Sequence, residues 1–414
     1  MRILMLAQWY PPIVGGEELH ARNLSVELVR RGHEVTVVTL AQRGLPEVEA
    51  HDGVEVIRLR SSAQRLEGLF ADPDRQSAAP IADPELVLGL DRIARRVRPD
   101  VMHAHNWIVH SALPLRLSGR APLLLTLHDF SLVCATKVLM RRGLNCSGPG
   151  PLKCLSCAAS HYGLVKGGIT TISNAVGAVI ERRAISGFIP VSTAVARGNG
   201  LDGLPHRVIP NFVPARPASA EVDLRPYLDR LPKEPFLLFV GAFGRLKGLH
   251  VLLEAYRLLR EPPPLVLIGY QMRETDELLA DPPPNVHVLG QWPPEAVQEA
   301  WRAAQMAIVP SVCQEACPTV VIEAMQAGIP VVATRMGGIP DLVAEGETGL
   351  LVPPDDPRGL ADAIEHLRAD RAEAARFGQA GKRRSALFTA GVVVPRIESA
   401  YREVVETGTL SAAP

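Results

Sequence analysis

Two carboxylates flank the start of a short helical segment in the second half of the chain. Glu315 and Glu323 lie eight residues apart in the run SVCQEACPTVVIEAMQAGIPVVA, and Pro318 between them fits the first position of a helix. The amides of Thr319 and Val320 would then point outward from the helix N-terminus, which favours a phosphate. Glu323 can accept hydrogen bonds from a ribose diol, and Glu315 from a sugar hydroxyl. The alternative is an ordinary amphipathic helix that begins with proline.

A glycine pair, Gly15-Gly16, follows the first apolar run and precedes a helical segment. Backbone without a Cβ can approach a phosphate or a sugar closely, so the pair is a candidate for donor binding. The motif is not Gly-x-Gly-x-x-Gly, and no acid follows at the distance that a dinucleotide ribose would need. A nicotinamide enzyme is therefore disfavoured. The alternative is a plain turn between a strand and a helix.

Two cations, Arg245 and Lys247, follow the buried run FLLFV. Positive charge after the first strand of a domain can offset the negative charge of a leaving diphosphate, so both residues are candidate ligands of a nucleotide donor. Solvated cations of an ordinary loop are the alternative.

Three histidines, His103, His105 and His128, stand at the C-terminal ends of two buried runs in the first half. These ends form the ligand-binding edge of a parallel sheet. A neutral imidazole there can hydrogen-bond a sugar hydroxyl, and we expect His105 to face the acceptor. Three histidines also suggest a metal site, but the spacing His-x-His and a distant third histidine lack a nearby set of acids. For His103, a structural role is the alternative.

Four cysteines lie within a short segment rich in glycine and proline, at about residues 130–158. They are Cys134, Cys146, Cys154 and Cys157, of which the last two form Cys-x-x-Cys. Four thiols at such spacing can bind one structural zinc ion in a tetrahedral site. Reduced free cysteines in an irregular loop are the alternative, since disulfides are not expected in the cytoplasm.

The run EAMQAGIPVVA, which begins at Glu323, resembles the signature of retaining glycosyltransferase family 4. That signature has two glutamates separated by seven residues, then Glu-Ala-Met-x-x-Gly-x-Pro-Val-Val-Ala. Two glycines and an acid usually follow shortly afterwards, as Gly337, Gly338 and Asp341 do here.

Other landmarks of that family occur in the expected order, so the resemblance covers nearly the whole chain. They include the glycine pair after the first strand and Lys247-Gly248 in the second half. One departure concerns the usual arginine of the second landmark, whose position is held by Ala242. Arg245 would then supply the second cation from a different position.

The resemblance implies a GT-B fold, in which two Rossmann-like domains face a central cleft. It implies that Glu315 contacts the donor sugar, Glu323 contacts the ribose and His128 lies near the donor sugar. It also implies transfer with retention through a front-face displacement, in which the leaving phosphate helps to deprotonate the acceptor. Enzymes of this fold stabilise the leaving diphosphate with helix N-termini and cations, so no catalytic metal is expected.

The elements that must position these residues alternate between strand and helix, which favours parallel sheets covered on both faces. In the first half we predict strands at 3–7, 34–39, 54–59, 101–104 and 123–126, and helices at 17–31 and 85–98. In the second half we predict strands at 236–240, 265–268, 286–289, 306–309 and 331–333, and helices at 248–260 and 318–327.

These elements divide into an acceptor domain at 1–208, which contains the cysteine segment, and a donor domain at 209–390. The proline-rich stretch 210–235 reads as an interdomain linker. A last helix, within 391–414, could pack back on the first domain.

The formal net charge of the chain is +0, but its halves differ. Residues 1–208 carry 24 Lys and Arg against 18 Asp and Glu, whereas residues 209–414 carry 20 against 26, and residues 86–208 alone carry 15 against 5. A basic surface on one domain suits an anionic partner such as membrane phospholipid. The alternative is a well-solvated arginine-rich face. No nucleic-acid partner is expected.

The segment 163–180 contains one charged residue, Lys166, and precedes Glu181-Arg182-Arg183. An apolar-leaning helix followed by cations can lie on a bilayer surface, and a buried helix of the first domain is the alternative. No run of eighteen apolar residues occurs, and the N-terminal run reads as a strand rather than a signal peptide. We therefore expect a cytoplasmic protein with peripheral contact at the inner membrane face.

The sequence thus predicts a glycosyltransferase that moves a sugar from a nucleotide-diphosphate donor of the UDP or GDP type. The acceptor would be a glycan, a lipid-linked sugar or a small molecule. Two alternatives stay open, a sugar-nucleotide epimerase of the same fold and a non-catalytic module that binds sugar nucleotides. The donor sugar and the acceptor do not follow from these motifs.

Overall fold

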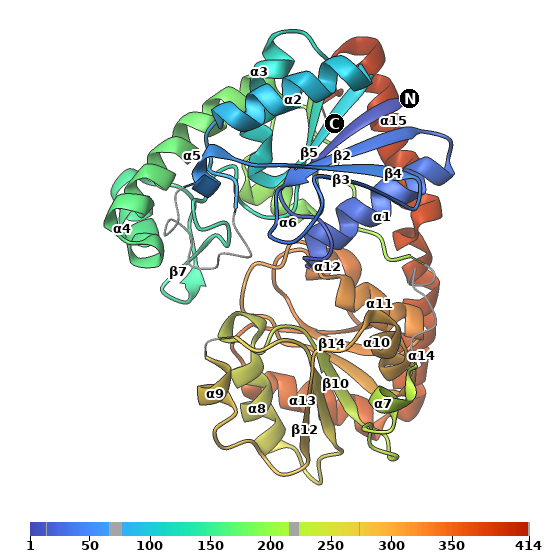
Figure 1. Ribbon diagram of the computed structural model, residues 1–414. Helices are drawn as coiled ribbons and strands as arrows, with labels where there is room; N and C mark the ends of the chain where they lie inside the picture. The colour runs from blue at the N-terminus through green and yellow to red at the C-terminus, as the bar shows by residue number, and fades with distance from the viewer. Residues whose placement is uncertain (14, 66–76, 215–222, 273, 413–414) are drawn as a thin grey trace. The chain divides into compact units, whose positions relative to one another are not determined.

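The computed structural model describes residues 1–13, 15–65, 77–214, 223–272 and 274–412. They form two compact units, each built on a largely or wholly parallel sheet (Figure 1). The first unit comprises Met1–Asn211 together with Val393–Pro414, and the second comprises Phe212–Val392. The chain therefore leaves the first unit once and returns to it with its last helix.

The sheet of the first unit has seven strands in the order β3-β4-β2-β1-β5-β6-β9. All neighbouring pairs are parallel except β3 and β4. The central strands are buried along their length, as a parallel sheet with helices on both faces requires. The strands are β1 Arg2–Ala7, β2 Glu34–Leu40, β3 Val48–His51, β4 Val54–Leu59, β5 Val101–His105, β6 Leu123–Leu127 and β9 Gly187–Pro190.

Two helices of the first unit, α2 and α6, start at side-chain caps. Asp83 caps α2, because its carboxylate accepts hydrogen bonds from the amides of Glu85 and Leu86, and Pro84 occupies the first turn. The helices are α1 Gly16–Arg30, α2 Pro84–Val97, α3 Val109–Leu117, α4 Pro151–Tyr162, α5 Leu164–Ala184 and α6 Thr193–Gly198. The cysteine segment is more regular than predicted, since it contains a hairpin of β7 Met140–Arg141 and β8 Leu144–Asn145 followed by α4.

The sheet of the second unit has six strands, all parallel, in the order β12-β11-β10-β13-β14-β15. The strands are β10 Leu237–Val240, β11 Leu265–Ile268, β12 Val286–Gly290, β13 Met306–Val309, β14 Val331–Thr334 and β15 Gly349–Val352. The helices are α7 Arg225–Leu228, α8 Leu249–Leu258, α9 Thr275–Leu278, α10 Pro294–Ala303, α11 Thr319–Ala327, α12 Ile339–Leu342, α13 Pro357–Ala369 and α14 Arg371–Ser385. A buried apolar cluster joins α8 and α13 to β10, β11 and β13.

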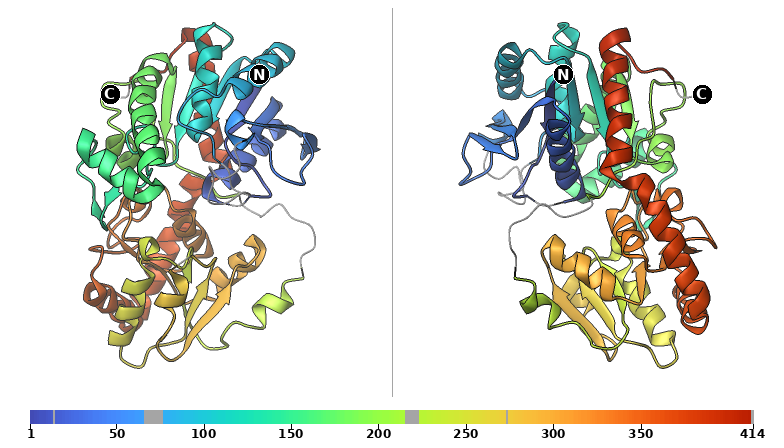
Figure 2. Two further views of the ribbon diagram at one scale, coloured as in Figure 1. Left: turned by 60° about the vertical axis from the view of Figure 1, so that its left-hand side comes forward. Right: turned by 90° about the vertical axis from the view of Figure 1, so that its right-hand side faces the viewer.

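The last helix, α15 Ala390–Thr407, packs on the sheet of the first unit (Figure 2). The Tyr401 hydroxyl lies 2.7 Å from His103 Nδ1, and the Glu398 carboxylate pairs with Arg31 and His33. Among the described residues, no helix is both long enough and apolar enough to cross a membrane.

Candidate active site

In the second unit, two neighbouring strands bring opposite charges to the carboxyl edge of the sheet. Lys247 follows β10 and Glu315 follows β13, and these strands pair in parallel. Lys247 Nζ donates a hydrogen bond to Glu315 Oε1 at 2.7 Å, and Ser311 Oγ donates to the same oxygen at 2.6 Å. Two residues that are 68 positions apart in the sequence are thus one ion pair at the edge where ligands of such sheets bind.

The electrostatics of this pair favour its charged form. Burial alone would raise the pKa of Glu315, but the charge of Lys247 and the hydrogen bonds from Lys247 and Ser311 lower the pKa below its ordinary value. Burial would lower the pKa of Lys247, yet the Glu315 carboxylate raises it. The Lys247 side chain is 37% exposed and that of Glu315 is 10% exposed, so the cation is the more accessible partner.

Two glycines allow the loops of this pair to approach one another. Gly248 has a φ of +72°, and a Cβ there would lie 1.9 Å from the carbonyl oxygen of Pro310. Gly337 has a φ of +54°, and a Cβ there would lie 2.0 Å from the carbonyl oxygen of Glu315. The Gly338 amide donates to that carbonyl at 2.7 Å. A larger residue at either glycine would displace the backbone that holds Lys247 or Glu315.

The second predicted glutamate lies one turn inside α11. Trp301 Nε1 donates to Glu323 Oε2 at 3.2 Å, and burial raises the pKa of this carboxyl. The helix begins at Thr319, so Pro318 is its N-cap and not, as predicted, its first residue. Thr319 and Val320 lie in the first turn, where backbone N–H groups have no carbonyl of a preceding turn. This helix end can receive an anion.

The Arg245 side chain has a different partner from that of Lys247. Its guanidinium donates to Glu277 Oε1 of α9 at 2.7 Å, and its own amide donates to Glu274. Both side chains of the Arg245–Glu277 pair are more than half exposed. The structure therefore brings Lys247, and not Arg245, to Glu315. The donor-binding role of Arg245 remains a prediction.

The polar edge of the first unit is a cluster of four histidines. His105 Nδ1 lies 2.9 Å from His128 Nε2, and His105 Nε2 lies 3.0 Å from the Met5 sulfur. The His103 ring lies 4.5 Å from that of His105, and the His20 ring lies 5.1 Å from that of His128. His20 was not predicted from the sequence. Its position one turn into the helix that follows the glycine pair could have indicated it.

The two predicted site histidines differ in exposure. His105 is fully buried between Met5 and His128, whereas His128 is partly exposed. His105 therefore holds the His128 ring in its orientation, and its acceptor-side role remains a prediction. His103 has a partner on each ring nitrogen, Tyr401 and Thr126, each at 2.7 Å, which is the arrangement of a structural histidine.

Burial sets the protonation of this cluster. It lowers the pKa of His103 and of His128 to about 3, with a further contribution from the neighbouring imidazoles. The pKa values of His20 and His105 are lowered well below the ordinary value for the same reasons. The four rings are thus neutral at physiological pH, and they can exchange hydrogen bonds with hydroxyl groups without adding charge.

A second polar network adjoins the glycine pair and was also missed by sequence reasoning. The Asn106 amide donates to Glu17 at 2.8 Å and to Asp129 at 3.3 Å, and it accepts from Lys137. Burial raises the pKa of Glu17 to about 7, although Lys137 opposes the shift. Glu17, Asn106 and Asp129 each come directly after a predicted site residue, and this position could have indicated them. Lys137 lies in the cysteine segment, away from any predicted site residue of the sheet edge.

The glycine pair begins α1. Gly15 is the N-cap and Gly16 is the first helical residue, and the neighbouring Val14 lies outside the described residues. A Cβ added at Gly16 would meet no atom within 4 Å. The open space on this side of Gly16 leaves room for a ligand. The predicted role of the glycine pair in donor binding stays a prediction.

The four predicted cysteines line one small cavity of about 20 Å³. Cys154 and Cys157 lie one turn apart on α4, Cys134 follows β6 and Cys146 follows β8. Burial and the other three thiols raise the pKa of Cys157. In the part of the chain that the structure describes, no group of His, Cys, Asp or Glu is arranged as a finished metal site.

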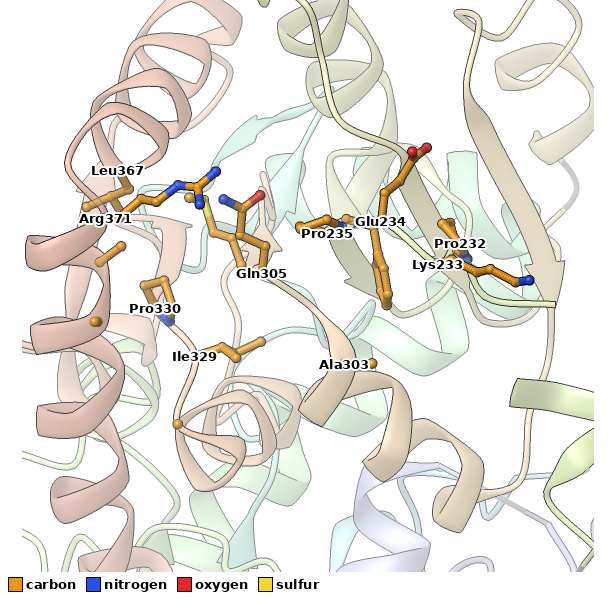
Figure 3. Close-up of a pocket in the computed structure, with 15 residues that line it drawn as sticks. Pro232, Lys233, Glu234, Pro235, Ala303, Gln305, Ile329, Pro330, Leu367 and Arg371 are labelled. Carbon is orange, nitrogen blue, oxygen red and sulfur yellow. The ribbon is translucent and has the colours of Figure 1, made fainter. Parts of the chain in front are cut away.

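A larger cavity of about 510 Å³ lies elsewhere in the second unit (Figure 3). Its wall includes Pro235, Gln305 and Pro330, which precede β10, β13 and β14. These positions mark the amino edge of the sheet, opposite the edge that carries Lys247 and Glu315. Because ligands of parallel sheets bind at the carboxyl edge, this cavity is not the candidate site.

Comparison with known proteins agrees with this architecture. Residues 14–216 match glycosyltransferase family 4, and residues 224–384 match glycosyl transferases group 1. The D-inositol 3-phosphate glycosyltransferase of Pseudarthrobacter chlorophenolicus is 31% identical over 388 residues, which cover 88% of this chain and 85% of that one.

Two solved structures illustrate the likeness in fold. Sucrose-phosphate synthase from Thermosynechococcus elongatus has a TM-score of 0.76 at 22% identity and covers 98% of this chain and 100% of its own. HepE from Anabaena, solved in complex with UDP, has a TM-score of 0.68 at 20% identity and covers 97% of this chain and 100% of its own. Both show the GT-B arrangement of two Rossmann-like domains.

Proposed function

The chain belongs to family 4 of the glycosyltransferases, and on that premise we propose that it transfers a sugar from a nucleotide-diphosphate donor to an acceptor hydroxyl with retention of configuration. We assign the donor to the second unit and the acceptor to the first. The observation that carries the proposal is the Lys247–Glu315 ion pair at the carboxyl edge of the second sheet.

The chemistry of that edge suits a diphosphate that leaves with negative charge. Lys247 is charged and partly exposed, and the first turn of α11 follows Glu315 within a few residues. A cation and a helix N-terminus both stabilise charge that develops on a phosphate oxygen. Support also comes from the HepE structure, a relative in fold that was solved with UDP.

The two glutamates would hold the donor at two points. Glu323, steadied by Trp301, would accept hydrogen bonds from the ribose diol. Glu315 is the ionised partner of Lys247 and would accept from hydroxyls of the transferred sugar. Each carboxylate offers two oxygens, so it can accept from adjacent hydroxyl groups while it keeps its protein partner.

Transfer needs no protein nucleophile in this proposal. The bond between the anomeric carbon and the phosphate oxygen breaks as the acceptor oxygen bonds to the same carbon on the same face. The acceptor proton passes to an oxygen of the leaving diphosphate. Lys247 and the α11 N-terminus stabilise the charge that develops on the diphosphate, which is the role that a metal ion fills in other enzymes, so we propose a metal-independent reaction. The neutral His128 would hydrogen-bond a sugar hydroxyl.

A panel of nucleotide sugars tests the proposal. The full chain is incubated with UDP- and GDP-linked sugars in excess chelator, and release of the nucleoside diphosphate is followed with and without sugar acceptors. We expect slow hydrolysis of one donor class that an acceptor accelerates. Release of a sugar epimer that no acceptor affects would instead identify an epimerase, and donor binding with no turnover would identify a binding module.

We also propose that the four cysteines of the first unit hold one structural zinc ion. The support is that all four cysteines line the same cavity, whose volume of about 20 Å³ is close to that of a single small occupant. Binding would require the thiols to turn inward and lose protons, and zinc thiolate bonds stabilise that form.

Elemental analysis of the purified chain tests the zinc proposal. We expect about one zinc per chain, lost in a Cys154→Ser/Cys157→Ser variant and kept in a Cys313→Ser variant, whose cysteine lies in the second unit. A zinc content near zero, with all four thiols reactive in the folded protein, would contradict the proposal.

A further inference from the structure

Helix α5 of the first unit has its apolar and polar faces reversed. Its buried face carries small or polar residues, namely Gly167, Thr170, Asn174, Gly177 and Glu181. Its outer face carries a stripe of large aliphatic side chains at helical spacing, namely Val165, Ile169, Ile172, Val176, Val179 and Ile180. In a helix that only covers a sheet, the aliphatic stripe faces the core. The outer stripe therefore needs an occupant of its own.

Close contacts of the buried face keep α5 in place, although that face buries no large aliphatic side chain. A Cβ at Gly167 would lie 2.5 Å from the backbone of Ala158 in α4, so α4 and α5 approach closely there. A Cβ at Gly177 would lie 2.5 Å from the ring of His110 in α3. His110 also faces Glu181 at 3.2 Å. These contacts fix the rotation of α5 and leave the stripe outward.

The exposed surface extends beyond the stripe itself. Leu152 of α4 and Leu164 are more than 80% exposed, while Val165, Ile169, Ile172 and Val176 are between 56% and 76% exposed. A groove of about 540 Å³ opens beside the stripe, between α5, the start of α4 and the segment after β6. Ile172 and Val176 line both the stripe and this groove, so the two form one apolar surface.

The charge around this surface has one sign. No Asp or Glu occurs between Phe130 and Ile180, whereas Lys153 and Lys166 lie on α4 and α5 and Arg183 follows the stripe. Lys166 and Arg183 are exposed. Helical periodicity puts Arg183 on the same face as Val165, Ile169 and Ile172. An apolar stripe bordered by cations complements a surface that is apolar inside and anionic outside.

We propose that the α4–α5 surface, defined by α4, α5 and their groove, docks the enzyme on an anionic phospholipid bilayer. Helix α5 would lie in the plane of the interface over its length of about 30 Å, with the stripe among the acyl chains and the cations at the headgroups. A second copy of the chain is a poorer occupant, because a two-fold contact would bring the same cations of both copies together.

Vesicle co-sedimentation of the full chain tests the proposal. We compare vesicles of phosphatidylcholine with vesicles that also contain phosphatidylglycerol, at low and at high salt. The chain is expected to sediment with the anionic vesicles at low salt and to be largely released at high salt, because exposed cations are screened. Equal and negligible sedimentation with both vesicle types at low salt would overturn the proposal.

Matched variants locate the contact. Ile169→Gln/Ile172→Gln/Val176→Gln should lower partition onto anionic vesicles by about tenfold or more. Val48→Gln/Leu88→Gln changes two aliphatic residues of the same unit that are equally exposed, at 56% and 60%, and should leave partition unchanged. Equal losses in both variants would overturn the assignment to α5. A dimer that the triple variant abolishes, without vesicle binding, would give this face to a second copy.

The outcome is independent of the proposed glycosyl transfer. The triple variant alters no residue assigned to donor or acceptor, so it should keep the hydrolysis of a soluble donor at the wild-type rate. Loss of vesicle binding with normal hydrolysis supports docking by α5. Loss of both activities, with a lower melting temperature, would show that the stripe is part of the fold and would contradict the proposal.

Discussion

The side chains at the carboxyl edges of the two sheets differ in their charge. At the edge of the first unit, burial keeps four imidazoles uncharged and lowers the pKa of His128 to about 3. At the edge of the second unit, Lys247 and Glu315 keep each other ionised although both are partly or wholly buried. A neutral edge suits the hydroxyl groups of sugars, and a charged edge suits a diphosphate. We therefore propose that the same type of sheet binds a different kind of ligand in each unit.

The largest expected effect is at Lys247. Lys247→Met removes the cation that would face the leaving diphosphate and leaves Glu315 without its counter-ion. We expect turnover to fall by about 100- to 1,000-fold, the usual cost of losing one preorganised electrostatic partner of a transition state. Steady-state transfer assays check this result. A fall of less than about threefold, in a variant that melts normally, would show that the cation does not act in transfer.

A somewhat smaller effect is expected at Glu315. Glu315→Gln keeps the shape of the side chain but removes its charge, so its hydrogen bonds to the transferred sugar should weaken. Turnover should fall strongly while the affinity for the nucleoside diphosphate stays near normal, because that product lacks the sugar. Parallel kinetic and calorimetric measurements decide the matter. If both quantities fall together, Glu315 belongs to the nucleotide site or supports the fold.

A third prediction concerns stability in the first unit. Burial beside His110 raises the pKa of Glu181 to about 8, well above its value in the unfolded chain. Its stabilising contribution is therefore complete below about pH 4.5 and is lost as the pH rises through 8. Between pH 5 and pH 8.5 the wild type should lose about 4 kcal/mol of unfolding free energy relative to Glu181→Gln.

Denaturant titrations of both proteins at the two pH values give this difference. The comparison isolates Glu181, because His110, whose pKa is lowered to about 4, is present in both proteins. The pH dependence that Glu315 adds to stability has the opposite sign, because its pKa is lowered. Its stabilising contribution is present at neutral pH and is lost as the pH falls through its folded-state pKa. A constant difference between the two proteins across this range would contradict the assignment of Glu181.

The smallest effect is expected at Arg245. Arg245→Met breaks a pair with Glu277 in which both side chains are mostly exposed, and such pairs contribute about 0–1 kcal/mol. Because Arg245 pairs with Glu277 and not with Glu315, we expect turnover to change by less than about threefold, in contrast to the donor-binding role that the sequence predicts, and this makes the variant the matched control for Lys247→Met. A larger loss in Arg245→Met than in Lys247→Met would reverse the roles of the two cations.

Local signals in the sequence were sufficient for much of the fold. The buried runs that become β1, β5, β6, β10 and β13 are continuous and apolar, as strands of a covered parallel sheet must be. Because ligand-binding residues follow such strands, position indicated Lys247, Glu315 and His128 as candidates, and the roles that the family resemblance implies for Glu315 and His128 remain predictions. The family resemblance, which the comparisons confirm, gave the GT-B fold.

Contacts between distant segments could not be predicted. The sequence does not show that Lys247 pairs with Glu315, that Tyr401 of the last helix bonds to His103, or that Lys137 reaches Asn106. Periodicity also cannot tell which face of a helix is buried. For α5, close contacts at Gly167 and Gly177 decide the rotation, and the apolar stripe lies outward.

The most direct test of the division between the two edges is a calorimetric titration of nucleoside diphosphate into paired variants. UDP and GDP are titrated into wild type, Glu323→Ala and His128→Ala. We predict that Glu323→Ala weakens binding of the preferred nucleotide by about 1–3 kcal/mol, the cost of losing a charged hydrogen-bond partner, and that His128→Ala leaves it unchanged. Unchanged affinity in Glu323→Ala together with lost affinity in His128→Ala would contradict the account.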